Sequence, residues 1–148
     1  NHLKVTCFTC HHGNEKPETL ADAIVPVLKK DGPEAAATRY RDLRKDYYGW
    51  AAYDFTEWSL VSVAEDLRHD PAQIANARAL LNLNLEFYPQ SAPTYAQIAE
   101  SYLAAGDTTT AMTNFDKAMQ LAPDDPRLKG PIEMIKNGGK MPGTPPKK

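Results

Sequence analysis

A spacing of 34 residues between four pairs of similar residues constrains the fold of this 148-residue chain more than any other feature. The pairs are Ala77 with Ala111, Leu81 with Phe115, Leu85 with Met119, and Pro89 with Pro123. Within each unit, apolar residues recur at helical spacing, and Gly106-Asp107 marks a turn between two such stretches. Fixed periods of this length indicate repeat architectures. The sequence therefore predicts an all-α fold built from stacked helical hairpins.

The best-defined unit, residues 92–126, resembles the tetratricopeptide repeat family. The matching positions are Tyr102, Ala111, Phe115 and Pro123. The resemblance implies a tetratricopeptide-like helical repeat array, whose stacked hairpins offer a concave surface to proteins or peptides. A closing helix from Pro126 to about Lys136 is expected to cover the last apolar face.

A preceding unit is predicted from the period, with one helix over residues 56–68 and a second over 71–87. Asp70 is expected to cap the second helix, with Pro71 in its first position. A weaker unit is expected before it, with a first helix over residues 19–30 and a restart after Asp31-Gly32-Pro33. Pro26 disfavours an unbroken helix there, so we expect a late start or a kink.

The cysteines are confined to one short motif, Cys7-Phe8-Thr9-Cys10-His11. Cys-x-x-Cys-His is the spacing for covalent attachment of haem c. On one helical turn the two thiols and the imidazole of His11 share a face, so both thiols can bond one macrocycle while His11 takes an axial iron position. Two alternatives stay open. One is a disulfide or dithiol pair, and the other is a zinc site, for which a histidine would have to supply the missing ligands.

The stretch from Val5 to Gly13 resembles the last haem-binding motif of the photosynthetic reaction-centre cytochrome c subunit family. The resemblance implies one covalent haem c held by Cys7 and Cys10, with His11 as proximal iron ligand. That family supplies a distal methionine from a helix upstream of the motif, whereas only six residues precede Cys7 and none of them is methionine.

The distal iron ligand is therefore expected from His2, from the downstream helices, from another subunit or from a segment upstream of Asn1. His2 is the preferred candidate within the chain, because it would give bis-histidine ligation. His12 adjoins the proximal ligand, so it is a candidate ligand for the haem of a neighbouring subunit. The methionines are weaker candidates, since methionine in a repeat helix is usually core filler; they are Met112, Met119, Met134 and Met141. His69 is expected to face solvent in a turn.

About eighteen N-terminal residues cannot enclose a haem, so another surface must cover it. An aromatic set around the central connection offers a face, although packing in the repeat core is the more frequent role of such residues. Its members are Tyr40, Tyr47, Tyr48, Trp50, Tyr53, Phe55 and Trp58. A neighbouring subunit is the other candidate, and head-to-tail contacts that do not close would produce filaments.

Three segments follow from these patterns: a haem-attachment segment (1–18), the helical repeats with their closing helix (19–137) and a flexible tail (138–148). The formal charge of -2 argues against electrostatic attraction to nucleic acid, and no apolar run is long enough to span a membrane. No catalytic triad or phosphate loop is found, so the chain is not expected to be an enzyme, with peroxidase-like chemistry at an open iron position as the exception.

The cytochrome resemblance implies maturation outside the cytoplasm, so we expect an export signal before Asn1 and a periplasmic or extracellular location. The expected function is electron transfer by a monohaem c-type cytochrome, with the repeats docking redox partners or copies of the chain. The alternative is a haem-free or haem-sensing adaptor.

Overall fold

The computed structural model describes residues 18–50 and 52–137. Within these ranges the chain is all-α, with seven α-helices, one short 3₁₀ helix and no strand. In chain order the elements are α2 (Leu20–Asp31), α3 (Pro33–Tyr47), α4 (Glu57–Arg68), η1 (Pro71–Gln73), α5 (Ile74–Phe87), α6 (Ala92–Ala104), α7 (Thr108–Leu121) and α8 (Pro126–Lys136). The predicted closing helix is confirmed at its expected bounds. The tail, and all but the last residue of the haem-attachment segment, lie outside the described residues.

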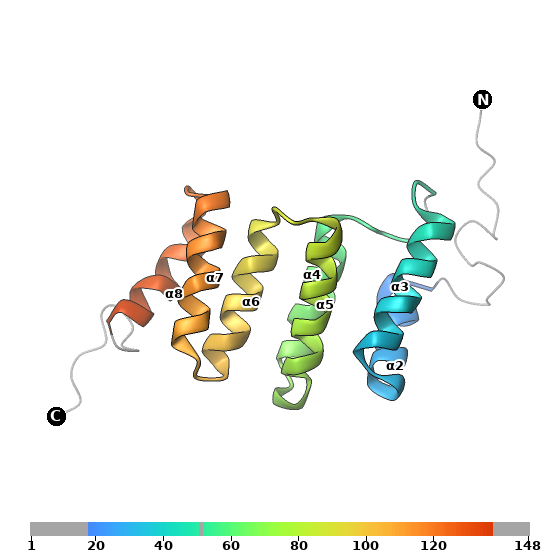
Figure 1. Cartoon of the computed structure of the whole chain (residues 1–148), viewed down its shortest axis with the longest axis horizontal. Helices are drawn as coiled ribbons and strands as arrows, with labels where there is room; N and C mark the ends of the chain where they lie inside the picture. Colours follow the sequence, from blue (N-terminus) through green and yellow to red (C-terminus); the bar gives the residue numbers. More distant parts are fainter. Residues whose placement is uncertain (1–17, 51, 138–148) are drawn as a thin grey trace.

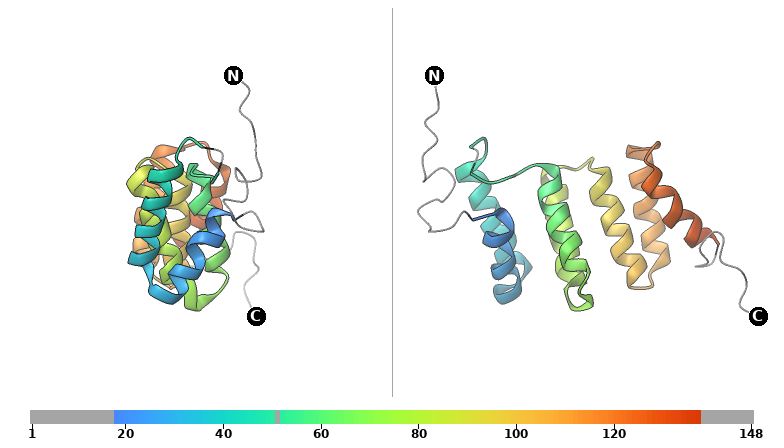
Figure 2. Two further views of the ribbon diagram at one scale, coloured as in Figure 1. Left: turned by 90° about the vertical axis from the view of Figure 1, so that its right-hand side faces the viewer. Right: turned by 180° about the vertical axis from the view of Figure 1, so that it is seen from behind.

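The helices pair along the chain and stack in a row, with α2 at one end and α8 at the other (Figure 1). The main contacts join α2 to α3, α4 to α5, and α6 to α7, while α8 packs on α7. Between pairs, α2 contacts α4, α4 contacts α6, and α3 contacts α5. Viewed along the row, the array is two helices deep (Figure 2, left). We call the layer that contains α2, α4, α6 and α8 the even-helix layer.

Short turn signals set the helix boundaries as the sequence predicts. Gly32 ends α2 with a φ of 88°, a conformation that glycine adopts without the strain a side chain would bring, and Pro33 begins α3. Gly106 turns the chain at φ 82°, and the Asp107 side chain then accepts a hydrogen bond from the Thr110 amide at 2.9 Å.

Two predicted details differ from the structure. Helix α2 continues through Pro26, although proline lacks an amide donor and costs roughly 3 kcal/mol inside a helix. Ile24 and Leu28 flank it and are fully buried, and each contributes about 1.5–3 kcal/mol, which offsets that cost. The prediction of an α-helix from Pro71 is also wrong, because Pro71–Gln73 form a 3₁₀ turn, capped by Asp70, before α5 begins.

The buried apolar residues form two clusters. The larger joins α2 to α5, together with Ile98 of α6, and includes the α4 residues Leu60, Val61, Ala64 and Leu67. The smaller joins α6, α7 and α8 around Phe115, which is fully buried. Ala99, Ala111 and Ala118 are also fully buried there, so small residues occur where the helices approach each other. Met112 and Met119 pack against this cluster.

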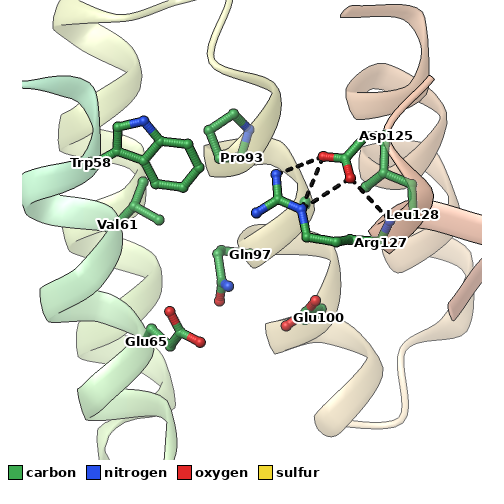
Figure 3. A pocket seen from close by; sticks show the side chains of 10 residues that line it. Trp58, Val61, Glu65, Pro93, Gln97, Glu100, Asp125, Arg127 and Leu128 are labelled. Atoms are coloured by element: carbon green, nitrogen blue, oxygen red, sulfur yellow. Dashed lines mark hydrogen bonds and ion pairs between the residues drawn. The ribbon is translucent and has the colours of Figure 1, made fainter. Parts of the chain in front are cut away.

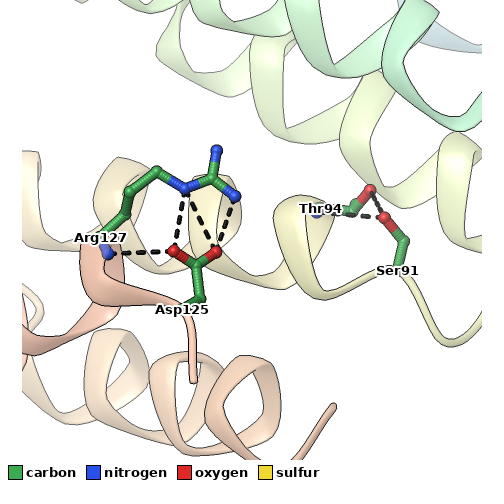
Figure 4. A network of polar contacts seen from close by, with 4 residues as sticks. All are labelled: Ser91, Thr94, Asp125 and Arg127. Atoms are coloured by element: carbon green, nitrogen blue, oxygen red, sulfur yellow. Dashed lines mark hydrogen bonds and ion pairs between the residues drawn. The ribbon is translucent and has the colours of Figure 1, made fainter. Parts of the chain in front are cut away.

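A buried polar network that the sequence did not reveal joins the α4/α5 pair to α6. Asn84 is fully buried, and its Nδ2 donates to the Glu57 carbonyl at 3.0 Å and to Thr94 Oγ1 at 2.8 Å. The Ser91 and Thr94 hydroxyls lie 2.6 Å apart at the start of α6 (Figure 4). Buried polar groups are costly unless they are bonded, so this network favours one relative placement of α4, α5 and α6.

The connection between α3 and α4 is held against α3 and α5. The Arg44 guanidinium donates to the Phe55 carbonyl at 3.1 Å and lies 4.2 Å from the centroid of the Tyr48 ring and 4.6 Å from that of Phe87. Tyr88 donates its hydroxyl proton to the same Phe55 carbonyl. These contacts hold the connection against α3 and α5, while its Tyr53 bonds to Glu18 beside the start of α2.

Candidate functional site

The predicted haem-attachment residues lie outside the described residues. They are Cys7, Cys10 and His11, together with the candidate distal or intersubunit ligands His2 and His12. The structure does describe the surface that the N-terminal segment joins, starting at Glu18. The first residues of that surface are the described residues closest in sequence to the predicted haem site.

The start of α2 is fixed by a reciprocal cap. Asp22 N donates to Thr19 Oγ1 at 3.1 Å, and Thr19 N donates to Asp22 Oδ2 at 3.0 Å. This capping box satisfies two amides that a helix start would otherwise leave without a helical partner. The hydrogen bond from the Thr19 backbone lowers the pKa of Asp22, because it stabilises the carboxylate. The point at which the N-terminal segment enters the array is thus well defined.

The α3–α4 connection is bonded to that entry point. The Tyr53 hydroxyl donates to Glu18 Oε2 at 2.7 Å, and its ring lies 5.5 Å from that of Tyr47, centroid to centroid. Burial, followed by the bond to Glu18, raises the pKa of Tyr53 to about 12. At neutral pH the phenol is therefore protonated and remains a donor.

A cavity of about 480 Å³ lies beside the entry point, between α2, α4 and the connection. We call it the junction cavity. Its lining residues are Glu18, Thr19, Leu20, Ala21, Ala52, Tyr53, Asp54, Trp58, Ser59, Ser62 and Val63. Trp58, in the first turn of α4, stands out because its side chain is 49% exposed despite its size. Ligand cavities are typically about 300–1,000 Å³ and mostly apolar, so this one is large enough for part of a bulky apolar group.

The lining of the junction cavity contains no imidazole and no thioether. Among the described residues the one histidine is His69, which caps the far end of α4 and is exposed, as expected. Met112 and Met119 pack in the second cluster, and Met134 lies in α8; Met141 lies outside the described residues. The junction cavity can therefore cover an iron cofactor, but it does not supply a distal ligand.

A second cavity, of about 310 Å³, lies further along the even-helix layer between α4, α6 and the start of α8 (Figure 3). We call it the acidic groove. Its lining residues are Trp58, Val61, Glu65, Pro93, Ala96, Gln97, Glu100, Asp125, Arg127 and Leu128. Trp58 lines both cavities, so its indole lies between them.

The charges of the acidic groove are partly paired. Arg127 donates from Nη2 to Asp125 Oδ2 at 2.6 Å and from Nε to Asp125 Oδ1 at 3.0 Å (Figures 3 and 4). These bonds lower the pKa of Asp125 to about 2. Glu100 pairs with Arg68 at 2.7 Å.

The remaining groups of the groove favour a hydrogen-bond donor. Glu65 is exposed at its edge, and the Gln97 Oε1 atom is buried with no donor among the described residues. A buried acceptor without a donor is costly, and a cation beside Glu65 would supply one. The Arg127 guanidinium already lies 5.8 Å from the centroid of the Trp58 ring. Its pKa is raised by the bonds to Asp125 and, to a lesser extent, by the charge of Glu65. A further ammonium or guanidinium group would therefore bind at the Glu65 and Gln97 side of the groove.

The structure divides the predicted aromatic set into two groups. Tyr40 and Phe55 are buried, and Tyr47 and Tyr53 are partly buried. All four therefore pack in the larger apolar cluster, as core residues do. Tyr48, Trp50 and Trp58 are exposed, and of these three Trp58 lines the junction cavity. The sequence signal for Trp58 was its large apolar side chain in the first turn of a helix whose buried stripe begins two residues later.

Two further observations concern metal binding and membrane crossing in the described part of the chain. It contains no cluster of three histidine, cysteine or acidic side chains placed to bind a metal ion. None of its helices combines the length and apolar character that crossing a bilayer requires. Comparisons with protein-family models and with curated proteins find no match to this chain.

Proposed function

We propose that this chain is a monohaem c-type cytochrome that transfers electrons, and that its helical array docks redox partners or further copies of the chain. The observation that carries the proposal is the Cys7-x-x-Cys10-His11 motif, with Glu18, seven residues after His11, at the edge of an apolar cavity. A covalent haem supplies one-electron redox chemistry. Attachment at Cys7 and Cys10 and ligation by His11 are part of this proposal.

The arrangement of helices supports a tetratricopeptide-like interpretation of residues 19–137. Consecutive helices pack as hairpins, small residues occupy the contacts between α6 and α7, and α8 closes the row. The two cavities lie along one layer, which is where a repeat array offers its extended binding surface. The exported location, periplasmic or extracellular, is what the cytochrome resemblance implies.

The acidic groove favours a partner with a basic segment. The exposed carboxylate of Glu65 and the buried Gln97 oxygen both attract a cation, beside the Trp58 ring over which the chain's own Arg127 lies. Residues 138–148 of this chain contain three lysines and no acidic residue. A second copy is therefore one partner of suitable chemistry, and heterologous contacts of this kind produce chains of subunits.

The first test is a pyridine haemochrome spectrum of exported, denatured protein after extraction with acidified organic solvent. Thioether-linked haem stays with the polypeptide, so a retained c-type signal is the expected result. Loss of the signal would leave the adaptor alternative, with a Cys7–Cys10 disulfide or dithiol. Cys7→Ala/Cys10→Ala protein is the matched control, since it exports the same array without thioether bonds.

The docking surface is tested separately by titrating a labelled peptide of residues 138–148 into the protein. Glu65→Lys should weaken binding, and added salt should weaken it further, because surface attraction is screened within about 8 Å at physiological ionic strength. Glu34→Lys is the control, since Glu34 is exposed at the start of α3, in the other layer. Equal effects of the two substitutions would rule out the acidic groove as the docking surface.

A further inference from the structure

The junction cavity lies where the N-terminal segment meets the array. Glu18 lines the cavity, and seven Cα steps separate it from His11. A chain of that length spans at most about 24 Å when extended. Any group bonded to Cys10 or His11 is therefore held close to this cavity, and tethering of this kind gives effective concentrations in the millimolar range.

The chemistry of the lining fits an apolar, planar group. Leu20, Val63 and the rings of Tyr53 and Trp58 form apolar walls. Trp58 is about half exposed, with the Arg127 guanidinium 5.8 Å from its ring centroid, although fully burying a large apolar side chain contributes about 1.5–3 kcal/mol. A macrocycle against the indole would bury both surfaces, with the offset stacking that aromatic groups prefer.

Charges at the rim set the orientation of such a group. Glu18 and Asp54 both line the cavity, and the Glu18 carboxylate already accepts the Tyr53 hydroxyl proton. Carboxylates of the incoming group would be repelled there. The acidic groove, on the other side of Trp58, is lined by three acidic residues and is less suited to an apolar, anionic cofactor.

We propose that the haem attached at Cys7 and Cys10 docks in the junction cavity against Trp58, with its propionates turned away from Glu18 and Asp54. This inference rests on the proposed haem attachment. It assigns Trp58 as a residue that covers the cofactor without ligating it, since no imidazole or thioether lines the cavity. The N-terminal segment of the same chain is the occupant.

Nuclear magnetic resonance of the full, haem-loaded chain in its reduced state tests this directly. The chain has two tryptophans, so two indole N–H signals are expected, and Trp50 is the internal control because it lines neither cavity. Relative to Cys7→Ala/Cys10→Ala protein, the Trp58 indole signal and the Ser59 and Ser62 amides should shift through the ring current of the haem. The Trp50 signal should stay in place.

A variant that blocks the junction cavity provides a second test, which compares two haem-loaded proteins instead of a haem-loaded and a haem-free one. Ser62 is exposed and lines the cavity, so Ser62→Glu adds a third carboxylate beside the proposed haem position. It should return the Trp58 signal towards its haem-free position. Thr113→Glu, an equal change of charge at an exposed position in α7, should leave the signal shifted.

The outcomes separate this inference from the proposed function. A haemochrome signal without a Trp58 shift would overturn the docking and leave haem attachment standing. A shift that disappears on dilution would also overturn it, because the haem would then be covered by a second copy. Absence of the haemochrome signal would overturn both.

Discussion

The hydroxyl of Tyr53 donates a 2.7 Å hydrogen bond to the carboxylate of Glu18, and so joins the α3–α4 connection to the residue that precedes the cap of α2. The two residues are 35 positions apart in the sequence, and both helices of the first pair lie between them. The bond therefore closes the end of the array at the point where the N-terminal segment enters. It also sets one wall of the junction cavity, since both residues line it.

Tyr53→Phe is expected to lower the free energy of unfolding by about 1 kcal/mol, the typical net worth of one hydrogen bond. The pKa of Tyr53 is about 12 in the folded protein and about 10 in an unfolded chain. A raised folded-state pKa stabilises the fold below pH 10, and this contribution is lost as pH rises from about 10 through about 12. The difference in stability between wild type and Tyr53→Phe should therefore shrink over that range.

Urea unfolding followed by circular dichroism between pH 8 and about 11 checks this dependence. Tyr48→Phe is the matched control, because Tyr48 is 60% exposed and belongs to the same connection. A stability difference for Tyr53→Phe that stays constant up to pH 11 would show that the Tyr53–Glu18 hydrogen bond does not contribute to the stability of the fold.

Local signals allowed most helix boundaries to be predicted from the sequence. Asp31-Gly32-Pro33 and Gly106-Asp107 act within a few residues, so their conformations follow from φ and capping preferences alone. The expected late start of α2 is wrong for the opposite reason, since the helix begins at Leu20 and runs through Pro26. Whether a proline breaks a helix depends on what burial of its neighbours contributes, and the burial of Ile24 and Leu28 depends on the whole fold.

Asp125→Asn is expected to weaken the Arg127 contact and destabilise the start of α8 at neutral pH. The wild-type pKa of Asp125 is lowered to about 2, chiefly by the side chain of Arg127. A lowered folded-state pKa stabilises the fold above about pH 4, and this contribution is lost as pH falls through about 2. Thermal unfolding should therefore distinguish the variant from wild type at pH 7 and much less at pH 2.

Asp124→Asn is the control for this prediction, because Asp124 is the exposed neighbour and makes no contact with Arg127 in the structure. Equal destabilisation by the two substitutions would indicate a general charge effect instead of the Asp125–Arg127 contact.

Phe115→Ala should lower the free energy of unfolding by about 3–5 kcal/mol, as large-to-small changes of buried aromatics do. Phe115 is fully buried at the centre of the smaller cluster, where α6, α7 and α8 meet. Met112→Leu, a change of similar volume at the edge of that cluster, should cost less than about 1.5 kcal/mol. Similar losses in urea unfolding would contradict the assigned position of Phe115.

The two cavities could not be predicted from the sequence, because each joins residues from elements far apart in the chain. Trp58 meets Leu20 across the junction cavity and Arg127 across the acidic groove, and no local pattern links these three positions. The Asn84 network was missed for the same reason, since its hydrogen bonds go to Glu57, 27 residues earlier, and Thr94, ten residues later. The haem-attachment residues, in contrast, were identified from five consecutive positions, and their roles stay a prediction.

The distal iron ligand provides the last prediction. The junction cavity is lined by no imidazole or thioether, and His69 caps the opposite end of α4, so the described residues beside the proposed haem offer neither ligand. His2 is then expected to complete bis-histidine ligation, and His2→Ala should convert a low-spin, six-coordinate haem into a high-spin one, seen as a shift of the Soret band and in magnetic circular dichroism. His12→Ala should leave the monomer low-spin, because His12 adjoins the proximal ligand. A low-spin His2→Ala protein that becomes high-spin only on dilution would instead assign the distal ligand to a neighbouring copy, for which His12 is the candidate.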